Sequence, residues 1–424
     1  MYIDDYRALQ EFYQQHLATV ILPFWLEQGI DTEQGGFFTC FDNRGERLVS
    51  FDKYTWSQGR MIWLLARLSE LSRAGLLQHD ANRLLVLAGQ GVEFVRQHAF
   101  LANGNCAYLL DRYGNKQEAL PGKGLDISFF ADCFVALGFS EYARVARDAE
   151  VLEQALTLCT HIIQRLKAGA VRSEPYPIPD GYEAHSTSMI MLNVTQELAS
   201  ALEAFGDARA AEVRKLSFAY MQAIMERFYQ PGGLIAEILP LQSASQESVL
   251  CRHVTPGHAI ESMWFVLREA RLQGQQQWLK PATQAIAKAF AVGWDQDYGG
   301  LFRFVDRNGG QPGGLQMGTP YEQLILDTWD TKLWWPHSEA LYGTLLAYEL
   351  SGERIFAELY QQVHEYVFKT FPHPEQPAGE WIQIRDRQGQ PIDKVVALPV
   401  KDPYHIIRNL VLIIELLQAH LPRA

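Results

Sequence analysis

Two histidines share one local pattern, in which a helix-capping residue is followed by proline, one further residue and histidine. The segments are Thr255-Pro256-Gly257-His258 and Asp402-Pro403-Tyr404-His405. Thr and Asp are favoured N-caps, and proline is favoured at the first helical position, so both histidines are expected in a first helical turn. The positive end of the helix dipole disfavours an imidazolium there. We therefore predict two neutral imidazoles that can accept a proton from a carbon next to a carbonyl.

Charged and polar residues recur around these histidines at nearly regular intervals. Glu261 and Arg408 follow the two histidines by three positions, so each shares a helical face with its histidine. The segment 335–339 resembles the other two, and Arg60 and Asn193 precede them at similar spacing. All are expected at one end of a repeating structure. Together with aromatic side chains suited to packing on a sugar ring, the candidate substrate-binding residues are Arg60, Tyr54, Asn193, Glu261, Trp335, His337, Glu339, Trp381 and Arg408.

His337 and the two glutamates could also serve in different roles. His337 could serve only to hold Glu339 or a backbone carbonyl. Glu261 and Glu339 could form the carboxylate pair of a glycosidase, although such a pair needs no neighbouring histidine. No group of residues suggests a metal ligand set. The five cysteines are widely spaced and indicate neither a disulfide framework nor a zinc site; they are Cys40, Cys106, Cys133, Cys159 and Cys251.

An internal repeat predicts the elements that position these residues. The stretch 34–45 runs from a Gly-Gly pair through a short apolar segment to a charged turn closed by glycine, and 298–309 repeats the same order of residue types. Glycine supplies the positive φ of tight turns, so each copy is expected to form a β-hairpin. Copies begin near positions 36, 104, 169, 232, 299 and 379. Six units of similar length therefore fill the chain.

The stretches between these copies have helical periodicity. Apolar residues recur at i, i+3 and i+4 in the ranges 61–68, 84–94, 261–272 and 340–350. Each unit has room for two helices and a hairpin. We predict an all-α (α/α)6 barrel, a toroid of six helix pairs with short β-hairpins between repeats, and a single catalytic domain over residues 1–424. An open α-solenoid is the alternative.

The composition excludes several classes of partner. The 424 residues are 48% hydrophobic, which is enough for an extensive core, and the formal net charge is −12. An acidic chain is a poor partner for nucleic acid or an anionic membrane. The first ten residues lack the apolar stretch of a signal peptide, and no window of about 18 apolar residues occurs. A soluble, cytoplasmic protein is expected.

Four motifs carry a resemblance to a known family. They are the segments 53–60, 256–261 and 404–408, and the string Trp334-Trp335-Pro336-His337-Ser338-Glu339, which is the most specific. In these motifs the sequence resembles the N-acylglucosamine 2-epimerase (renin-binding protein) family. The resemblance spans positions 53 to 408. It implies an (α/α)6 barrel that interconverts N-acetylglucosamine and N-acetylmannosamine.

The resemblance also implies roles for particular residues. His258 and His405 match the family's acid/base pair, and Arg60 and Glu339 match residues of its substrate site. No cofactor is required, but ATP is a possible allosteric activator, and the segment 121–124 is a weak candidate for binding phosphate. A homodimer is expected. The alternatives are an aldose–ketose isomerase or a mannose- or cellobiose-type 2-epimerase on the same scaffold, and a non-catalytic carbohydrate-binding toroid.

Overall fold

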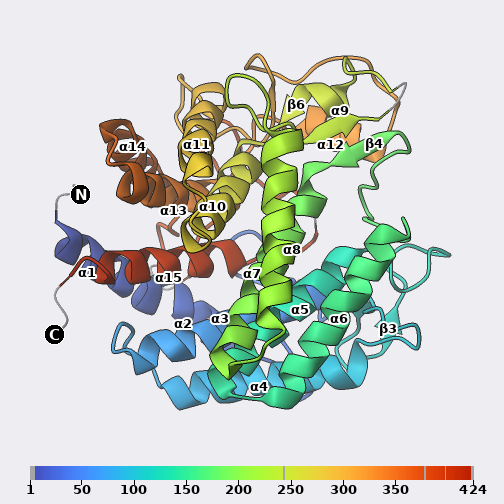
Figure 1. The fold of residues 1–424 in the computed structure, drawn as a ribbon. Coiled ribbons are helices and arrows are strands. Elements are labelled where there is room, and N and C mark those ends of the chain that lie inside the picture. Colours follow the sequence, from blue (N-terminus) through green and yellow to red (C-terminus); the bar gives the residue numbers. More distant parts are fainter. Residues whose placement is uncertain (1–4, 242–243, 377–378, 397, 422–424) are drawn as a thin grey trace.

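The inner helices form a closed ring. A computed structural model describes residues 5–241, 244–376, 379–396 and 398–421. Each inner helix packs against the next one around the ring, and the last packs against the first. The arrangement is seen in Figure 1. In chain order the inner helices are α3 (Thr55–Arg73), α5 (Phe129–Ala146), α7 (His185–Phe205), α10 (Pro256–Leu272), α13 (Trp334–Ser351) and α15 (Tyr404–Gln418).

An outer helix packs against each inner one. Inner helices are buried on nearly every face, whereas an outer helix such as α14 buries one stripe that includes Phe356, Tyr360, Val363 and Val367. That spacing is the apolar stripe of an amphipathic helix. The outer helices, in the order of their inner partners, are α4 (Ala81–His98), α6 (Ala149–Lys167), α8 (Ala210–Ala223), α11 (Leu279–Gly293), α14 (Arg354–Thr370) and α1 (Tyr6–His16).

The two ends of the chain close the ring. Helix α1 lies beside α15, and the two ends of the described chain lie on the same side of the molecule (Figure 1). The Gln10 side-chain amide donates to the Ile414 carbonyl at 3.1 Å and to the Gln418 side chain at 3.0 Å. The sixth pair is therefore built from opposite ends of the sequence. The predicted (α/α)6 barrel is confirmed, and the closed ring excludes the open solenoid.

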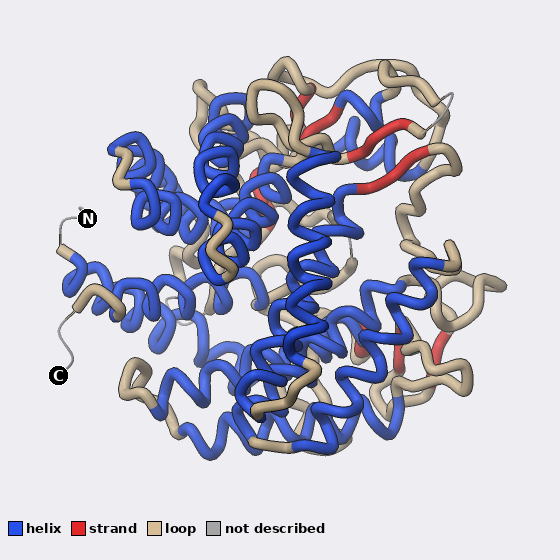
Figure 2. The backbone as a smooth tube through the Cα atoms, viewed as in Figure 1, coloured by secondary structure: helices blue, strands red, loops and turns tan. Residues whose placement is uncertain are grey.

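Short strands join the start and end of a helix pair. Most of them lie at the right of Figure 2, away from the chain termini. Among the strands of the described residues, only β2 (Leu109–Leu110) and β3 (Lys116–Gln117) pair as a local hairpin. The other antiparallel pairs are β1 (Lys53–Tyr54) with β2 (Leu109–Leu110), β4 (Tyr182–Ala184) with β5 (Ile238–Pro240), β6 (His253–Val254) with β7 (Val305–Asp306), and β8 (Lys332–Leu333) with β9 (Ile384–Arg385).

The predicted hairpins are mostly tight turns. In the turn after α11, Trp294 and Leu301 form a single β-bridge, and Gly299 and Gly300 have φ of 75° and 76°. The glycines form turns as predicted. The strand that follows the turn, Val305–Asp306, pairs with His253–Val254 and not with the segment just before the turn. Where a strand lies directly before an inner helix, it pairs instead with the strand that follows the outer helix of the same pair.

Buried lysines hold equivalent turns in two units. Lys53 Nζ donates to a carboxylate and a carbonyl of the turn 31–35, at 2.8 and 2.6 Å. Lys332 Nζ makes the same two contacts with the turn 295–300, at 3.1 and 3.2 Å. Both lysines immediately precede an inner helix. The repeat detected in the sequence is thus also a repeat of buried polar contacts.

The remaining elements are short. They comprise α2 (Leu22–Gln28), α9 (Val249–Arg252), α12 (Pro320–Thr328), a 3-10 turn (Gln276–Trp278) and two π-helical turns (Leu17–Ile21 and Ile224–Phe228). None of the helices in the described ranges is long and apolar enough to cross a bilayer. A close contact fixes the start of α3, because a Cβ on Gly59 would lie 2.3 Å from the Phe134 carbonyl oxygen on α5.

Candidate active site

A cavity of about 840 Å³ opens between the N-terminal ends of the inner helices. Its size is in the range of small-molecule sites. The structure brings seven of the sequence-predicted residues together in its wall. They are His258, His405, Arg60, Asn193, Glu261, Trp335 and Arg408.

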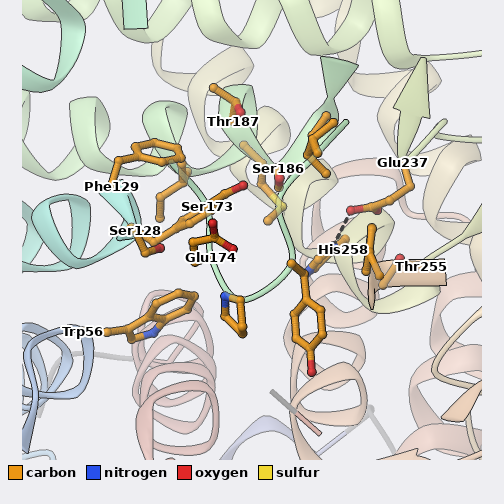
Figure 3. Close-up of a pocket in the computed structure, with 18 of the residues that line it drawn as sticks. Trp56, Ser128, Phe129, Ser173, Glu174, Ser186, Thr187, Glu237, Thr255 and His258 are labelled. Atoms are coloured by element: carbon orange, nitrogen blue, oxygen red, sulfur yellow. Dashed lines mark hydrogen bonds and ion pairs between the residues drawn. The ribbon is translucent and has the colours of Figure 1, made fainter. Parts of the chain in front are cut away.

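His258 carries a buried carboxylate partner. Its Nδ1 lies 2.8 Å from Glu237 Oε1, the contact drawn as a dashed line in Figure 3. Burial by itself lowers the pKa of His258, but the charge and hydrogen bond of Glu237 outweigh burial and raise that pKa above its ordinary value. Burial raises the pKa of Glu237, but the charge and hydrogen bond of His258 outweigh burial and lower the pKa of Glu237 to about 2. Glu237 therefore favours the protonated form of His258, and the Nε2 side of the ring remains for a ligand.

His405 is in the opposite state. Burial lowers its pKa to about 3, and the nearby guanidinium groups of Arg60 and Arg408 act in the same direction. Its Nδ1 lies 2.6 Å from Glu339 Oε1. Because a carboxylate can only accept, Nδ1 carries the proton and Nε2 keeps its lone pair. His405 is thus a neutral base with a fixed tautomer.

The pKa of His405 is shifted in the direction that the helix-start pattern predicts, whereas the pKa of His258 is shifted in the opposite direction. The helix dipole acts on both residues, but it is worth only about 1 kcal/mol. A buried carboxylate in contact with the ring is a stronger influence. Glu237 lies 21 positions before His258 in the chain and outside its helix, so the capping pattern gave no sign of it.

Glu339 is a positioning residue beneath the cavity. It is fully buried and accepts from His405, from Asn409 Nδ2 at 2.7 Å, from Trp264 Nε1 at 2.7 Å and from Arg408 Nη2 at 2.7 Å. Arg408 also pairs with Glu261. Oxygen and nitrogen atoms of Glu261, Glu339 and His405 lie within 4.8 Å of one another, a spacing that suits a metal ion. The Arg408 guanidinium bonds to both carboxylates, so it already supplies the positive charge there.

Arg60 lies beside the free nitrogen of the base. Its Nη2 is 3.5 Å from His405 Nε2, and Nη1 pairs with the Asp402 carboxylate. The guanidinium lies over the rings of Trp56 at 4.9 Å and Phe134 at 4.1 Å. These contacts fix the group on the cavity wall. Its position suits stabilisation of an oxyanion on the atom next to the one that His405 deprotonates.

Trp335 contacts both histidines. Its ring centroid lies 5.0 Å from that of His258 and 5.6 Å from that of His405. A Cβ on Gly257 would lie 2.5 Å from the Trp335 ring, so only glycine lets the indole approach α10 this closely. The two histidines are therefore held beside one aromatic side chain in the wall of one cavity.

The comparisons with known proteins show the family of the chain. The sequence profile described as N-acylglucosamine 2-epimerase (GlcNAc 2-epimerase) matches residues 36–409. The chain belongs to the N-acylglucosamine 2-epimerase family. The protein is therefore an isomerase of the epimerase type, and the non-catalytic toroid is excluded. N-acylglucosamine 2-epimerase from Bos taurus is 31% identical over 95% of this chain and 90% of its own length. The Homo sapiens enzyme is 30% identical over 98% and 92%.

Solved structures with low sequence identity share the fold. A D-mannose isomerase is 16% identical with a TM-score of 0.74, covering 98% of this chain and 99% of its own. Cellobiose 2-epimerase from Bacillus thermoamylovorans B4167 is 19% identical with a TM-score of 0.73, covering 96% and 99%. These likenesses support the barrel within which the epimerase-family site is built.

His337 lies outside the cavity wall, contrary to its assignment to substrate. It is fully buried, its Nε2 accepts from the Leu301 backbone N–H at 2.8 Å, and Nδ1 donates to the Leu333 carbonyl at 2.5 Å. Gln58 makes the matching contact in another unit of the repeat, since its side chain bonds to both backbone groups of Phe37. His337 therefore holds a turn against an inner helix, close to the alternative that the sequence left open.

Three other residues predicted to bind substrate also do not line the cavity. Trp381 is fully buried and donates its indole N–H to His16 Nε2 at 2.9 Å. Tyr54 packs edge-on against Tyr108, with ring centroids 5.6 Å apart. Glu339 acts through His405, whose ring nitrogen it contacts. The aromatic residues that do line the cavity include Trp56 and Phe130.

The structure adds Glu237, Asp402, Trp56 and Arg303 to the site. The repeat contained a signal for two of them. Ile235 and Leu301 are the equivalent bridge residues of consecutive turns, and Glu237 and Arg303 each follow by two positions. The weak phosphate candidate at 121–124 is filled internally, because the Gly122 and Gly124 N–H groups donate to the Glu118 carboxylate at 2.8 and 3.1 Å.

Proposed function

We propose that the protein interconverts N-acetylglucosamine and N-acetylmannosamine by inverting C2 of the open-chain sugar. The observation that carries this proposal is the presence in one cavity wall of two histidines, both in contact with Trp335, whose pKa values are shifted in opposite directions. Inversion needs a base on one face of C2 and an acid on the other. The family relationship and the curated relatives that bear the name N-acylglucosamine 2-epimerase support this substrate pair.

The chemical step follows from the two free Nε2 atoms. His405 Nε2 takes the C2 proton, and the electron pair of that C–H bond forms a C1=C2 double bond while the C1 oxygen becomes anionic. Arg60, whose Nη2 lies 3.5 Å from the base, donates to that oxygen. His258 then delivers its Nε2 proton to the opposite face of C2, and the C1 carbonyl re-forms. A positioned acid or base contributes roughly 10²–10⁴-fold to the rate.

Proton NMR in deuterated buffer tests the proposal. Incubation with N-acetylglucosamine should produce N-acetylmannosamine while the C2–H signal disappears, because both histidines exchange protons with solvent. His405→Asn and His258→Asn should each remove turnover and leave the thermal unfolding temperature within a few degrees. Full activity in either variant contradicts the two-histidine mechanism.

The same assay separates the related reactions. An aldose–ketose isomerase would return the proton to C1 and give a ketose from glucose or mannose. A second histidine in the cavity, whose contact with Glu237 favours its protonated form, supports inversion, because an isomerase needs only one group to carry the proton from C2 to C1. A ketose product, or turnover of cellobiose without turnover of N-acetylglucosamine, would replace the proposed substrate.

We also propose that the protein acts as a cytoplasmic homodimer and that ATP activates it without being consumed. Both follow from the family resemblance. Sedimentation at several concentrations tests the dimer. Epimerase rates with and without ATP, with ADP release monitored in parallel, test the effector role.

A further inference from the structure

Arg303 is a buried cation in the wall of the active-site cavity. It lies between the Trp294–Leu301 turn and β7, and only 6% of its surface is exposed. Its Nη1 donates to Thr328 Oγ1 at 2.9 Å and its Nη2 to the Val396 carbonyl at 2.6 Å. Both acceptors are neutral. They fix the guanidinium, and within the described residues they are the acceptors of its hydrogen bonds, although the group has five N–H donors.

The other cations of the cavity wall have carboxylate partners. Arg60 pairs with Asp402, Arg408 with Glu261, and His258 with Glu237. In the described part of the chain, Arg303 makes no such ion pair. Burial lowers its pKa to about 10, so it still carries its charge near neutral pH. A buried, unpaired charge is costly unless a bound ligand supplies a strong acceptor.

The repeat places Arg303 next to the acid. Glu237 and Arg303 follow equivalent bridge residues, Ile235 and Leu301, by two positions in consecutive units. Both residues therefore point from the same end of the ring into the same cavity. Val254 pairs with Val305 in the antiparallel strands β6 and β7, so Arg303 lies beside the start of α10, the helix that carries His258. This position suits contact with a substituent on C2, the atom at which His258 is proposed to act.

We propose that Arg303 determines specificity for N-acylated sugars by donating a hydrogen bond to the carbonyl oxygen of the 2-acylamino group. This inference rests on the proposed function. The side chains of Phe304, Leu324 and Val396 line the same part of the wall and give the acyl methyl group an apolar surface. A sugar with a hydroxyl at C2 offers no such oxygen, so the buried charge of Arg303 stays without a strong acceptor in its complex.

The contact between Arg303 and the acyl carbonyl oxygen is tested by measuring two substrates, N-acetylglucosamine and N-thioacetylglucosamine, with both the wild type and Arg303→Met. N-thioacetylglucosamine replaces the carbonyl oxygen with sulfur, which is a much weaker acceptor. For the wild type, this replacement should raise KM by roughly 10- to 100-fold, as expected for one hydrogen bond to a charged group. In Arg303→Met the two substrates should have nearly equal KM. Because any intrinsic effect of sulfur on the substrate is common to both enzymes, it cancels when the KM ratio of the wild type is compared with that of Arg303→Met.

Arg307→Met is the matched control. Arg307 lies four positions along the same segment but pairs with Glu247 at the surface, so this variant should keep the wild-type ratio of the two KM values. Arg303→Lys retains the charge and should show an intermediate ratio, which gives a second variant if Arg303→Met unfolds. The inference is overturned if the ratio of the KM values for N-thioacetylglucosamine and N-acetylglucosamine is the same in the wild type and in Arg303→Met. So does competitive inhibition by inorganic phosphate that Arg303→Met abolishes, because Arg303 would then be an anion site. A wild type that does not epimerise N-acetylglucosamine at all refutes the proposed function instead.

Discussion

Replacing Glu237 by glutamine should remove the charge that keeps His258 protonated while retaining an acceptor for its Nδ1. The carboxylate oxygen lies 2.8 Å from the ring nitrogen, and Glu237 is only 4% exposed, so the solvent screens this contact little. An opposite charge at such a distance shifts a pKa by roughly 1–3 pH units. Each pH unit corresponds to about 1.4 kcal/mol.

The sign of the effect follows from the role of His258 as the acid. In the wild type its raised pKa keeps the active, protonated form present to higher pH, and activity falls as the pH rises through that pKa. In Glu237→Gln the fall should begin roughly 1–3 pH units lower. The loss of rate should therefore grow as the pH rises and should reach roughly 10- to 1000-fold at pH values above the His258 pKa of the wild type.

The assay is kcat/KM for C2 epimerisation of N-acetylglucosamine between about pH 5.5 and 9.5, because this quantity reports the free enzyme. Glu247→Gln, which removes an exposed carboxylate that pairs with Arg252 and Arg307, should leave the profile unchanged. An unmoved alkaline limb in Glu237→Gln would refute the assignment of His258 as the protonated acid. A uniform loss at every pH would do the same, since it would indicate a role for Glu237 unrelated to protonation.

Three further substitutions test other parts of the site. Glu339→Gln should lower kcat roughly 10²-fold or more, because the amide no longer fixes the His405 tautomer; kcat unchanged at saturating substrate would contradict that positioning role. His337→Ala should cost about 2–4 kcal/mol of unfolding free energy by removing two buried hydrogen bonds, and kcat of the folded fraction should stay near the wild-type value. Gly257→Ala should displace the Trp335 ring from its contacts with the two histidines and so lower kcat; a lower unfolding temperature with unchanged kcat would argue against the role given to Trp335.

Local sequence determined the architecture. Six glycine-rich turns at similar spacing, with apolar helical periodicity between them, were enough to predict six helix pairs. The capping residues and prolines also located the helix starts that carry His258 and His405. Such signals act over a few residues, so they can be recognised without knowing which segments meet.

Tertiary structure decided the chemistry of those helix starts. His258 and His337 begin similar segments, yet one faces the cavity and the other holds a backbone turn, because each meets a different part of the neighbouring unit. The partners that set charge are also distant in sequence: Arg60 meets Asp402, and His405 meets Glu339. Proton affinity depends on burial and on charges a few ångströms away in space. Those distances exist only once the ring has closed, so the sequence could indicate two histidines but not that their pKa values shift in opposite directions.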